Sequence, residues 1–144
     1  MKAMNGLEAY LKTTDLEPGL LDLVKLRASQ INGCAYCTDM HSLDARAGGD
    51  TEQRIYCLPV WRETPFYTER ERAAFEWTEA LTLLPQSGVP DEVYEAVKPH
   101  FTEKELVDLT TAIALINAWN RFGVSFRDEP GQYVPKKKAQ PETV

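Results

Sequence analysis

Residues 32–41 read NGCAYCTDMH and hold the most reactive side chains of this chain. They place two thiols and one imidazole close together, at Cys34, Cys37 and His41. Positions i, i+3 and i+7 share one face of a helix, so these side chains are expected in one row. The Asn-Gly pair before them is a turn signal, which predicts that a helix begins here. The partial positive charge at the amino end of that helix favours thiolate over thiol.

Helical spacing continues on both sides of this stretch. Between residues 18 and 31 the apolar positions follow the i, i+3, i+4 pattern of an amphipathic helix, with Pro18 suited to its first turn. The helix that carries the thiols is expected from about Cys34 to Ala47. The glycines at 48 and 49 end it, because glycine adopts positive φ without strain.

Two capping boxes mark the starts of the later helices. In each box a Thr side chain and a Glu three residues on satisfy backbone donors reciprocally. The box at residues 68–71 predicts a helix to about Leu84. The box at residues 102–105 predicts the last and longest helix, which should end near Phe122 because Gly123 offers a stop.

The pattern as a whole predicts an all-α protein, a compact bundle of about six helices. No run alternates apolar and polar residues with the period of a strand for long enough. Shorter features are expected as an opening helix near residues 7–11, a short helix ended by Pro59, a loop over 85–90 and a brief helix over 91–98. We expect one helical domain over residues 1–127 and a flexible carboxyl-terminal tail over 128–144, where Pro, Lys, Gln, Gly and Glu dominate.

Composition excludes several classes of function. The net charge of −6 argues against nucleic acid as a partner, since a phosphate-binding surface needs clustered Lys and Arg, and the basic run 136–138 lies in the expected tail. The longest apolar window, residues 106–126, is interrupted by charged and amide side chains that a membrane span would not tolerate. No secretory signal pattern begins the sequence, so we expect a cytoplasmic protein.

A C-x-x-C pair serves redox couples and zinc sites, and two buried structural thiols are a third interpretation. Cys57 could complete a Cys3His zinc set with Cys34, Cys37 and His41. Structural zinc pairs usually sit on turns that wrap the ion, however, and three ligands on one straight helix wrap it poorly. We therefore expect no metal and no cofactor, and place Cys57 on the apolar side of its short helix.

Residues 23–41, LVKLRASQINGCAYCTDMH, resemble the signature of the alkyl hydroperoxidase D-like (AhpD-like) proteins of the carboxymuconolactone decarboxylase superfamily. The resemblance continues through residues 53–54, 61–63 and 116–121 and covers nearly all of the chain except its two ends. It implies an all-helical AhpD-like subunit that assembles as a trimer or hexamer. It also implies a peroxidase of antioxidant defence, with a peroxide as substrate and an external dithiol or disulfide reductase as partner.

The resemblance also implies a role for each site residue. Cys37 matches the peroxide-attacking cysteine and Cys34 its resolving partner, although proximity to the helix dipole would by itself make Cys34 the more acidic thiol. His41 matches the histidine of a proton relay. Asp22 occupies the position of the relay's acid, which is usually Glu, and Tyr36 stands where some members carry a histidine between the cysteines.

Two other functions remain open at this point. One is a redox-sensing or structural oligomer, in which the disulfide of Cys34 and Cys37 switches or stabilises an interface. The other is a lactone decarboxylase like that of the same superfamily, in which the C-x-x-C pair would be idle.

Overall fold

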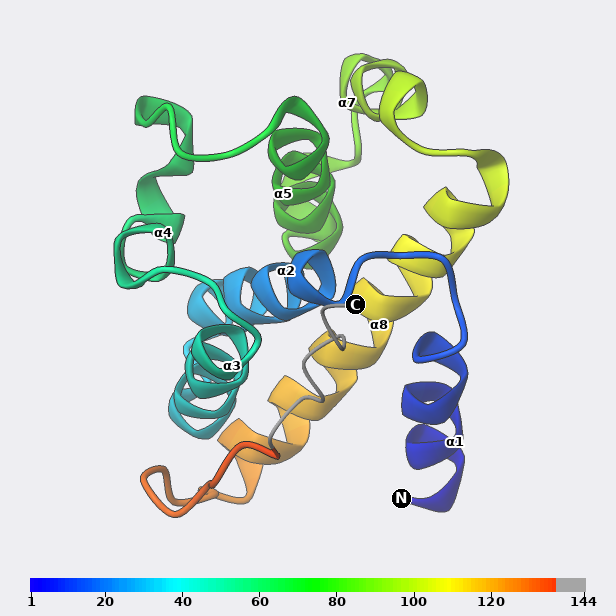
Figure 1. Cartoon of the computed structure of the whole chain (residues 1–144). Coiled ribbons are helices and arrows are strands. Elements are labelled where there is room, and N and C mark those ends of the chain that lie inside the picture. The colour runs from blue at the N-terminus through cyan, green and yellow to red at the C-terminus, as the bar shows by residue number, and fades with distance from the viewer. Residues whose placement is uncertain (137–144) are drawn as a thin grey trace, which may run out of the picture.

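The computed structural model describes residues 1–136, which form helices and turns without a β-strand (Figure 1). The elements in chain order are α1 (Lys2–Leu11), α2 (Pro18–Ile31), α3 (Ala35–Ala47), α4 (Glu52–Tyr56), the 3-10 helix η1 (Leu58–Glu63), α5 (Glu69–Thr82), α6 (Leu84–Ser87), α7 (Asp91–Val97), the 3-10 helix η2 (Lys98–His100) and α8 (Glu103–Ser125). Six of these described helices have seven or more residues, so the expected all-α bundle is confirmed.

Helix α2 is the central element of the bundle. It packs against α3, α5 and α8, and Figure 1 shows it crossing the middle of the molecule. Val24 faces one apolar cluster, built with α1, α5 and α8. Leu23 and Leu26 face a second cluster, built with α3, α4, η1 and α5. Since α2 is buried on both sides, its carboxyl end is held firmly, and the candidate site begins there.

The turn from α2 into α3 depends on one glycine. The chain leaves α2 at Asn32, and Gly33 then adopts φ 64°, a left-handed conformation that residues with a Cβ rarely take. The backbone N–H of Cys34 donates back to the carbonyl of Ser29 at 3.0 Å. This turn places Cys34 at the N-cap of α3, so the predicted helix start is confirmed.

A polar network joins this turn to α8. The side-chain amide of Asn32 donates to Oδ1 of Asn117 and to Oδ1 of Asn120, both at 2.9 Å. Asn120 is 1% exposed, and its own amide donates to Oγ of Ser29 at 3.0 Å. Buried amides are costly unless they are bonded in this way, so the network fixes α8 against the end of α2.

Two helix boundaries differ from the prediction. Helix α8 does not stop at Gly123 but continues to Ser125, because a glycine ends a helix only where the backbone turns left-handed, and Gly123 remains helical. The predicted loop at 85–90 is also partly wrong. Residues 84–87 form the short helix α6, which Gly88 ends with φ 60°. Both capping boxes are present as predicted.

The segment after α8 folds back over α3. The backbone N–H of Gly131 donates to Oδ2 of Asp39 at 2.9 Å, and the hydroxyl of Tyr133 donates to Oδ1 of Asp44 at 2.7 Å. Residues 128–136, expected as part of a flexible tail, therefore lie against the helix that carries the thiols. The remainder of that expected tail, 137–144, lies outside the described residues.

None of the helices within residues 1–136 combines the length and the apolar run needed to cross a bilayer, and the 23-residue α8 is no exception.

Candidate active site

The two thiols of the C-x-x-C pair are joined as a disulfide. The Cα atoms of Cys34 and Cys37 lie 5.3 Å apart, as the first turn of α3 dictates. The sulfur of Cys34 also accepts the backbone N–H of Cys37 at 3.3 Å and so caps the helix. Both residues are buried, at 1% and 3% exposure. After reduction, the sulfur at the helix start would meet backbone donors and the positive end of the dipole, which favour thiolate.

A cavity of about 1210 Å³ opens beside this disulfide. Of the two cysteines, Cys37 lines it. His41 contributes from the same helix, and Asp22 and Lys25 contribute from α2. The carboxyl-terminal segment closes another side of the cavity, where Tyr133 lies. The fold thus brings Cys37, His41 and Asp22 to one solvent-connected space.

His41 is a buried imidazole at the wall of this cavity. It is 6% exposed, and within residues 1–136 neither ring nitrogen has a hydrogen-bond partner. Nδ1 lies 3.9 Å from Oδ2 of Asp44, which is longer than a hydrogen bond. Burial, and then the charge of Lys25, lower the pKa of His41 to about 3. In this oxidised form the ring is therefore neutral and has an open nitrogen for an incoming proton.

Asp22, the expected acid of the relay, is half-buried on α2. Asp22 and Tyr133 line the same cavity, and the charge of Asp22 adds to the burial and the hydrogen bond to Asp44 that raise the pKa of Tyr133. Asp44 was not predicted, although it follows His41 at i+3. The spacing of His41 and Asp44 can be seen in the sequence. The contact with Tyr133, which distinguishes Asp44 from the other acid of α3, cannot.

Sequence reasoning also missed the part that Gly123 has in the site. A methyl group placed on its Cα would lie 2.7 Å from Sγ of Cys34, 3.4 Å from Sγ of Cys37 and 3.9 Å from Oδ2 of Asp128. Real side chains essentially never approach as closely as the first of these distances. Glycine at this position therefore lets α8 pack directly on the disulfide.

The third cysteine lies apart from this arrangement. Cys57 is a free, half-buried thiol between α4 and η1. Across residues 1–136 no three His, Cys, Asp or Glu side chains are grouped so that they could hold a metal ion. The zinc interpretation therefore has no ligand set in the described part of the chain.

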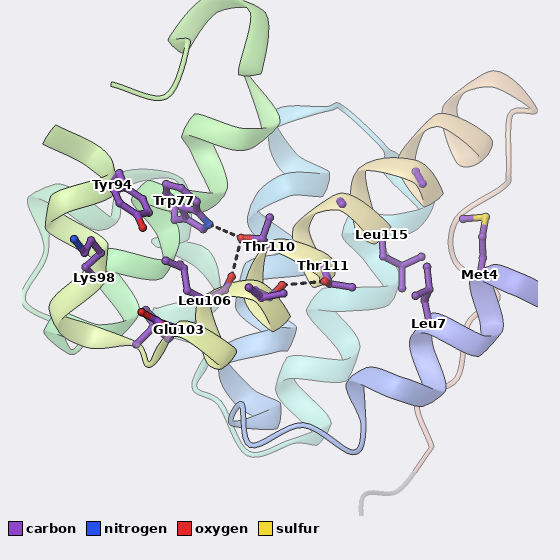
Figure 2. A pocket seen from close by; sticks show the side chains of 14 residues that line it. Met4, Leu7, Trp77, Tyr94, Lys98, Glu103, Leu106, Thr110, Thr111 and Leu115 are labelled. Carbon is purple, nitrogen blue, oxygen red and sulfur yellow. Dashed lines mark hydrogen bonds between the residues drawn. The ribbon is translucent and has the colours of Figure 1, made fainter. Parts of the chain in front are cut away.

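A second hollow, of about 870 Å³, lies on another face of α8, between α1 and α7 (Figure 2). Its walls are mainly apolar, and the indole of Trp77 donates to Oγ1 of Thr110 at 3.0 Å on one side. The described residues that line it include no cysteine or histidine. The reactive groups therefore belong to the first cavity.

The fold and the site define a class of protein: an all-helical protein of the AhpD-like type, with a disulfide-forming cysteine pair at the start of α3. Comparison with known proteins agrees with this class. Residues 1–80 match the sequence profile of the Carboxymuconolactone decarboxylase family. The chain is 48% identical over 125 residues to the uncharacterized protein YdfG of Bacillus subtilis, an alignment that covers 87% of this chain and 85% of YdfG. The chain belongs to the carboxymuconolactone decarboxylase family.

Two solved structures show how far this fold extends. ATU0492 of Agrobacterium tumefaciens, a protein of unknown function to which an AhpD antioxidant-defence role has been ascribed, is 45% identical with a TM-score of 0.88, covering 92% of this chain and 90% of that one. The debrominase Bmp8 shares the fold at 19% identity and a TM-score of 0.78, covering 90% and 70%. The fold is therefore shared by proteins with different names and activities.

The packing at Gly123 predicts the effect of one added methyl group. Gly123→Ala should lower the unfolding free energy of the oxidised protein by about 1–3 kcal/mol, because α8 or the disulfide must move to admit it. Gly6→Ala is the matched control, since Gly6 is also helical and its Cβ would meet nothing within 4 Å. It should be neutral or raise stability by up to about 1 kcal/mol. Urea unfolding measures both, and equal stabilities of the two variants would refute the packing argument.

The buried His41 predicts a pH dependence of stability. Its pKa is about 3 in the folded oxidised protein and about 6.5 in an unfolded chain. Between these values the unfolded state binds a proton that the folded state does not. Stability should therefore fall as pH is lowered through this window, by up to about 1.4 kcal/mol per pH unit, with no contribution above it.

Urea unfolding at about pH 7 and about pH 5 tests this dependence. His41→Gln should lose about 2 kcal/mol less than the wild type over that interval, because its side chain does not titrate. His100→Gln keeps His41 and should show the wild-type loss. An equal loss in the His41 variant and the wild type would show that the ring is not held neutral.

Proposed function

We propose that this chain is a thiol-dependent peroxidase of antioxidant defence, in which Cys34 and Cys37 form the redox centre. The observation that supports it most directly is the Cys34–Cys37 disulfide at the start of α3, with Cys37 and a neutral imidazole lining one cavity. A thiol becomes a nucleophile when a neighbouring base removes its proton. The base we propose is His41, which lies four residues after Cys37 on α3 and lines the same cavity.

The reaction follows from these groups. In the reduced protein Cys37 gives its proton to His41, and Asp22 stabilises the charged ring as the acid of the relay. The thiolate attacks one peroxide oxygen, the O–O bond breaks, and the leaving oxygen takes the proton to become an alcohol. Cys37 is then a sulfenic acid. The sulfur of Cys34 attacks that of Cys37, so that the S–O bond breaks, water leaves and the disulfide forms.

The lining of the cavity supports Cys37 as the attacking thiol. Both cysteines are buried, at 1% and 3% exposure, but Cys37 lines the cavity and Cys34 does not, and Gly123 lies closer to the sulfur of Cys34. The helix dipole acts most strongly on Cys34, but a nucleophile that a peroxide cannot reach gains nothing from acidity. Accessibility therefore outweighs the dipole in this assignment, which is also the one that the AhpD-like resemblance implies.

Turnover needs a reductant that the chain does not itself supply. We propose an external dithiol, free or on a disulfide-reductase partner, that gives two electrons to the Cys34–Cys37 disulfide and leaves as a disulfide. A cytoplasmic setting, where thiols are kept reduced, suits this cycle.

Two further candidate functions can be distinguished from a peroxidase by the result of one experiment each. If oxidation changes the state of assembly but peroxide is not consumed repeatedly in the presence of a dithiol, the chain is a redox-sensing or structural oligomer. If the cysteines are dispensable and a small lactone acid loses carbon dioxide, it is a decarboxylase. The Cys34–Cys37 disulfide, which has no part in decarboxylation, favours the peroxidase over the latter.

Single-turnover experiments with an alkyl hydroperoxide test the cysteine order. They are made in a Cys57→Ser background, so that the free third thiol does not confuse the count. The parent should lose both remaining thiols in one reaction. Cys34→Ser should accumulate a sulfenic acid that dimedone traps, because the resolving thiol is gone, and Cys37→Ser should form none. The reverse pattern would overturn the assignment, and no thiol loss in any variant would overturn the peroxidase.

We propose further that the chain is a homo-oligomer, a trimer or a hexamer. Large apolar side chains that are exposed in the single chain support this, among them Val107 at 65% and Phe126 at 74%. Phe126 stacks on Phe122 and extends the apolar surface at the end of α8. Sedimentation equilibrium of the whole chain should give three or six times the monomer mass, and a monomer at micromolar concentration would contradict the proposal.

A further inference from the structure

The carboxyl-terminal segment is bonded to the active-site helix α3 at two points, one of which is a phenol. Tyr133 comes from the chain that follows α8, and its hydroxyl donates to Oδ1 of Asp44 at 2.7 Å. Burial first, and then this hydrogen bond, raise the pKa of Tyr133. The phenol therefore keeps its proton and acts as a lasting donor, and the backbone N–H of Gly131 anchors the same segment on Asp39.

The second oxygen of Asp44 lies toward the imidazole. Oδ2 is 3.9 Å from Nδ1 of His41, one helical turn away on α3. An N–H···O hydrogen bond has its heavy atoms about 2.7–3.2 Å apart, so this pair is close to hydrogen-bond distance, and the bond needs one of the two side chains to move toward the other. The carboxylate of Asp44 thus lies between the phenol of Tyr133 and the imidazole of His41. Its hydrogen bond to Tyr133 restricts the positions that the carboxylate can take.

The imidazole needs such a carboxylate when it becomes charged. Charged groups line the cavity from every side: Glu8 from α1, Lys12, Asp15 and Glu17 from the turn after it, Asp22 and Lys25 from α2, Asp44 from α3, and Asp128, Glu129 and Lys136 from the carboxyl-terminal segment. Lys25 is paired with Glu8 at 2.7 Å, so Glu8 offsets part of its charge. Lys25 and the burial of the ring both oppose the protonated form. A proton from Cys37 therefore stays on the ring only if an acid close to the ring compensates.

We propose that Asp44, held by Tyr133, is a positioning residue of this site that fixes Nδ1 of His41 and stabilises the ring once it has taken the proton of Cys37. The proposal rests on the proposed function and adds a second acid to a relay in which Asp22 was the only one expected. The proton moves from the sulfur of Cys37 to Nε2 of His41, while Nδ1–H donates to Asp44. Asp44 takes no proton, and Tyr133 remains a phenol.

The test measures how readily Cys37 forms a thiolate, without any peroxide. Reduced protein in the Cys57→Ser background is alkylated with iodoacetamide across a range of pH, and mass spectrometry of the Cys37 peptide gives the rate. Asp44→Asn should raise the midpoint of the rate profile by about one pH unit, the shift expected for losing one nearby charge. Tyr133→Phe should move it in the same direction by less, because the carboxylate remains but is no longer held.

The direction of the shift distinguishes positioning from simple charge removal. Taking away a carboxylate near a thiol lowers the thiol midpoint if the two merely repel each other. Asp39→Asn is the matched control, since it removes the same charge from the same helix and keeps an acceptor for Gly131. Because Asp39 does not line the cavity with the imidazole, its loss should leave the midpoint in place or lower it slightly, and should not raise it. An Asp44 variant that matches this control, or shifts downward, would overturn the proposal.

The same series separates this proposal from the proposed function. Alkylation needs no peroxide, so an upward shift in Asp44→Asn in a protein that never reduces peroxide would support the positioning role while the peroxidase fails. A protein that reduces peroxide, and whose profile moves with Asp22→Asn but not with Asp44→Asn, would keep the peroxidase and overturn the role of Asp44.

Discussion

The close approach of α8 to the Cys34–Cys37 disulfide at Gly123 is the constraint on which the site depends. With no Cβ at this position, the helix covers Cys34 and seals one side of the disulfide from solvent. The amides of Asn32 and Asn120 hold the two helices at that distance, and both are satisfied by the bonds they make. Access is therefore left on the side of Cys37, where the cavity opens. The packing at Gly123 is therefore closest to Cys34, and only Cys37 of the two cysteines lines the cavity.

The electrostatics of the site are linked to its redox state. A disulfide has no proton to give, and in the oxidised structure the neighbouring imidazole is buried and neutral. Reduction adds two protons, and the proposed relay passes one of them to that imidazole. The charged ring of that proposal would be stabilised by a carboxylate, and those of Asp22 and Asp44 line the cavity from two different helices. Burying the ring without a hydrogen bond lowers the stability of the oxidised form. The same unbonded ring nitrogen is the atom that can accept a proton in the reduced form.

The local parts of this structure could be predicted from the sequence, and the long-range parts could not. The capping boxes, Pro18 and the turn at Gly33 act within a few residues, so their meaning is visible in the sequence, and the helices they delimit are present. The spacing of Cys34, Cys37 and His41 likewise needs only one helix.

Gly123 and Tyr133 act on residues far from them in the chain, and each was interpreted by its local propensity, as a helix stop and as part of a tail. A glycine that makes room for a disulfide and a glycine that ends a helix look alike in sequence. The contacts of a single tyrosine in a polar segment leave no periodic pattern. The sequence around Gly123 and the sequence around Tyr133 therefore did not indicate the roles of these two residues in the site.

The chemistry of the thiol pair and the choice of substrate are set by different parts of the molecule. A dithiol that closes to a disulfide always delivers two electrons, whatever accepts them. A fold that also occurs in a debrominase at 19% identity does not by itself select the acceptor. Selection must come from the walls that surround Cys37, where Tyr36, Trp119 and Tyr133 line the cavity from α3, α8 and the carboxyl-terminal segment. Two of these three aromatic side chains come from the last third of the chain, beyond the C-x-x-C motif and beyond residues 1–80 that match the family profile. The cysteine pair and most of the cavity lining therefore lie in the part that matches the family, and the carboxyl-terminal part adds one wall of aromatic and charged side chains.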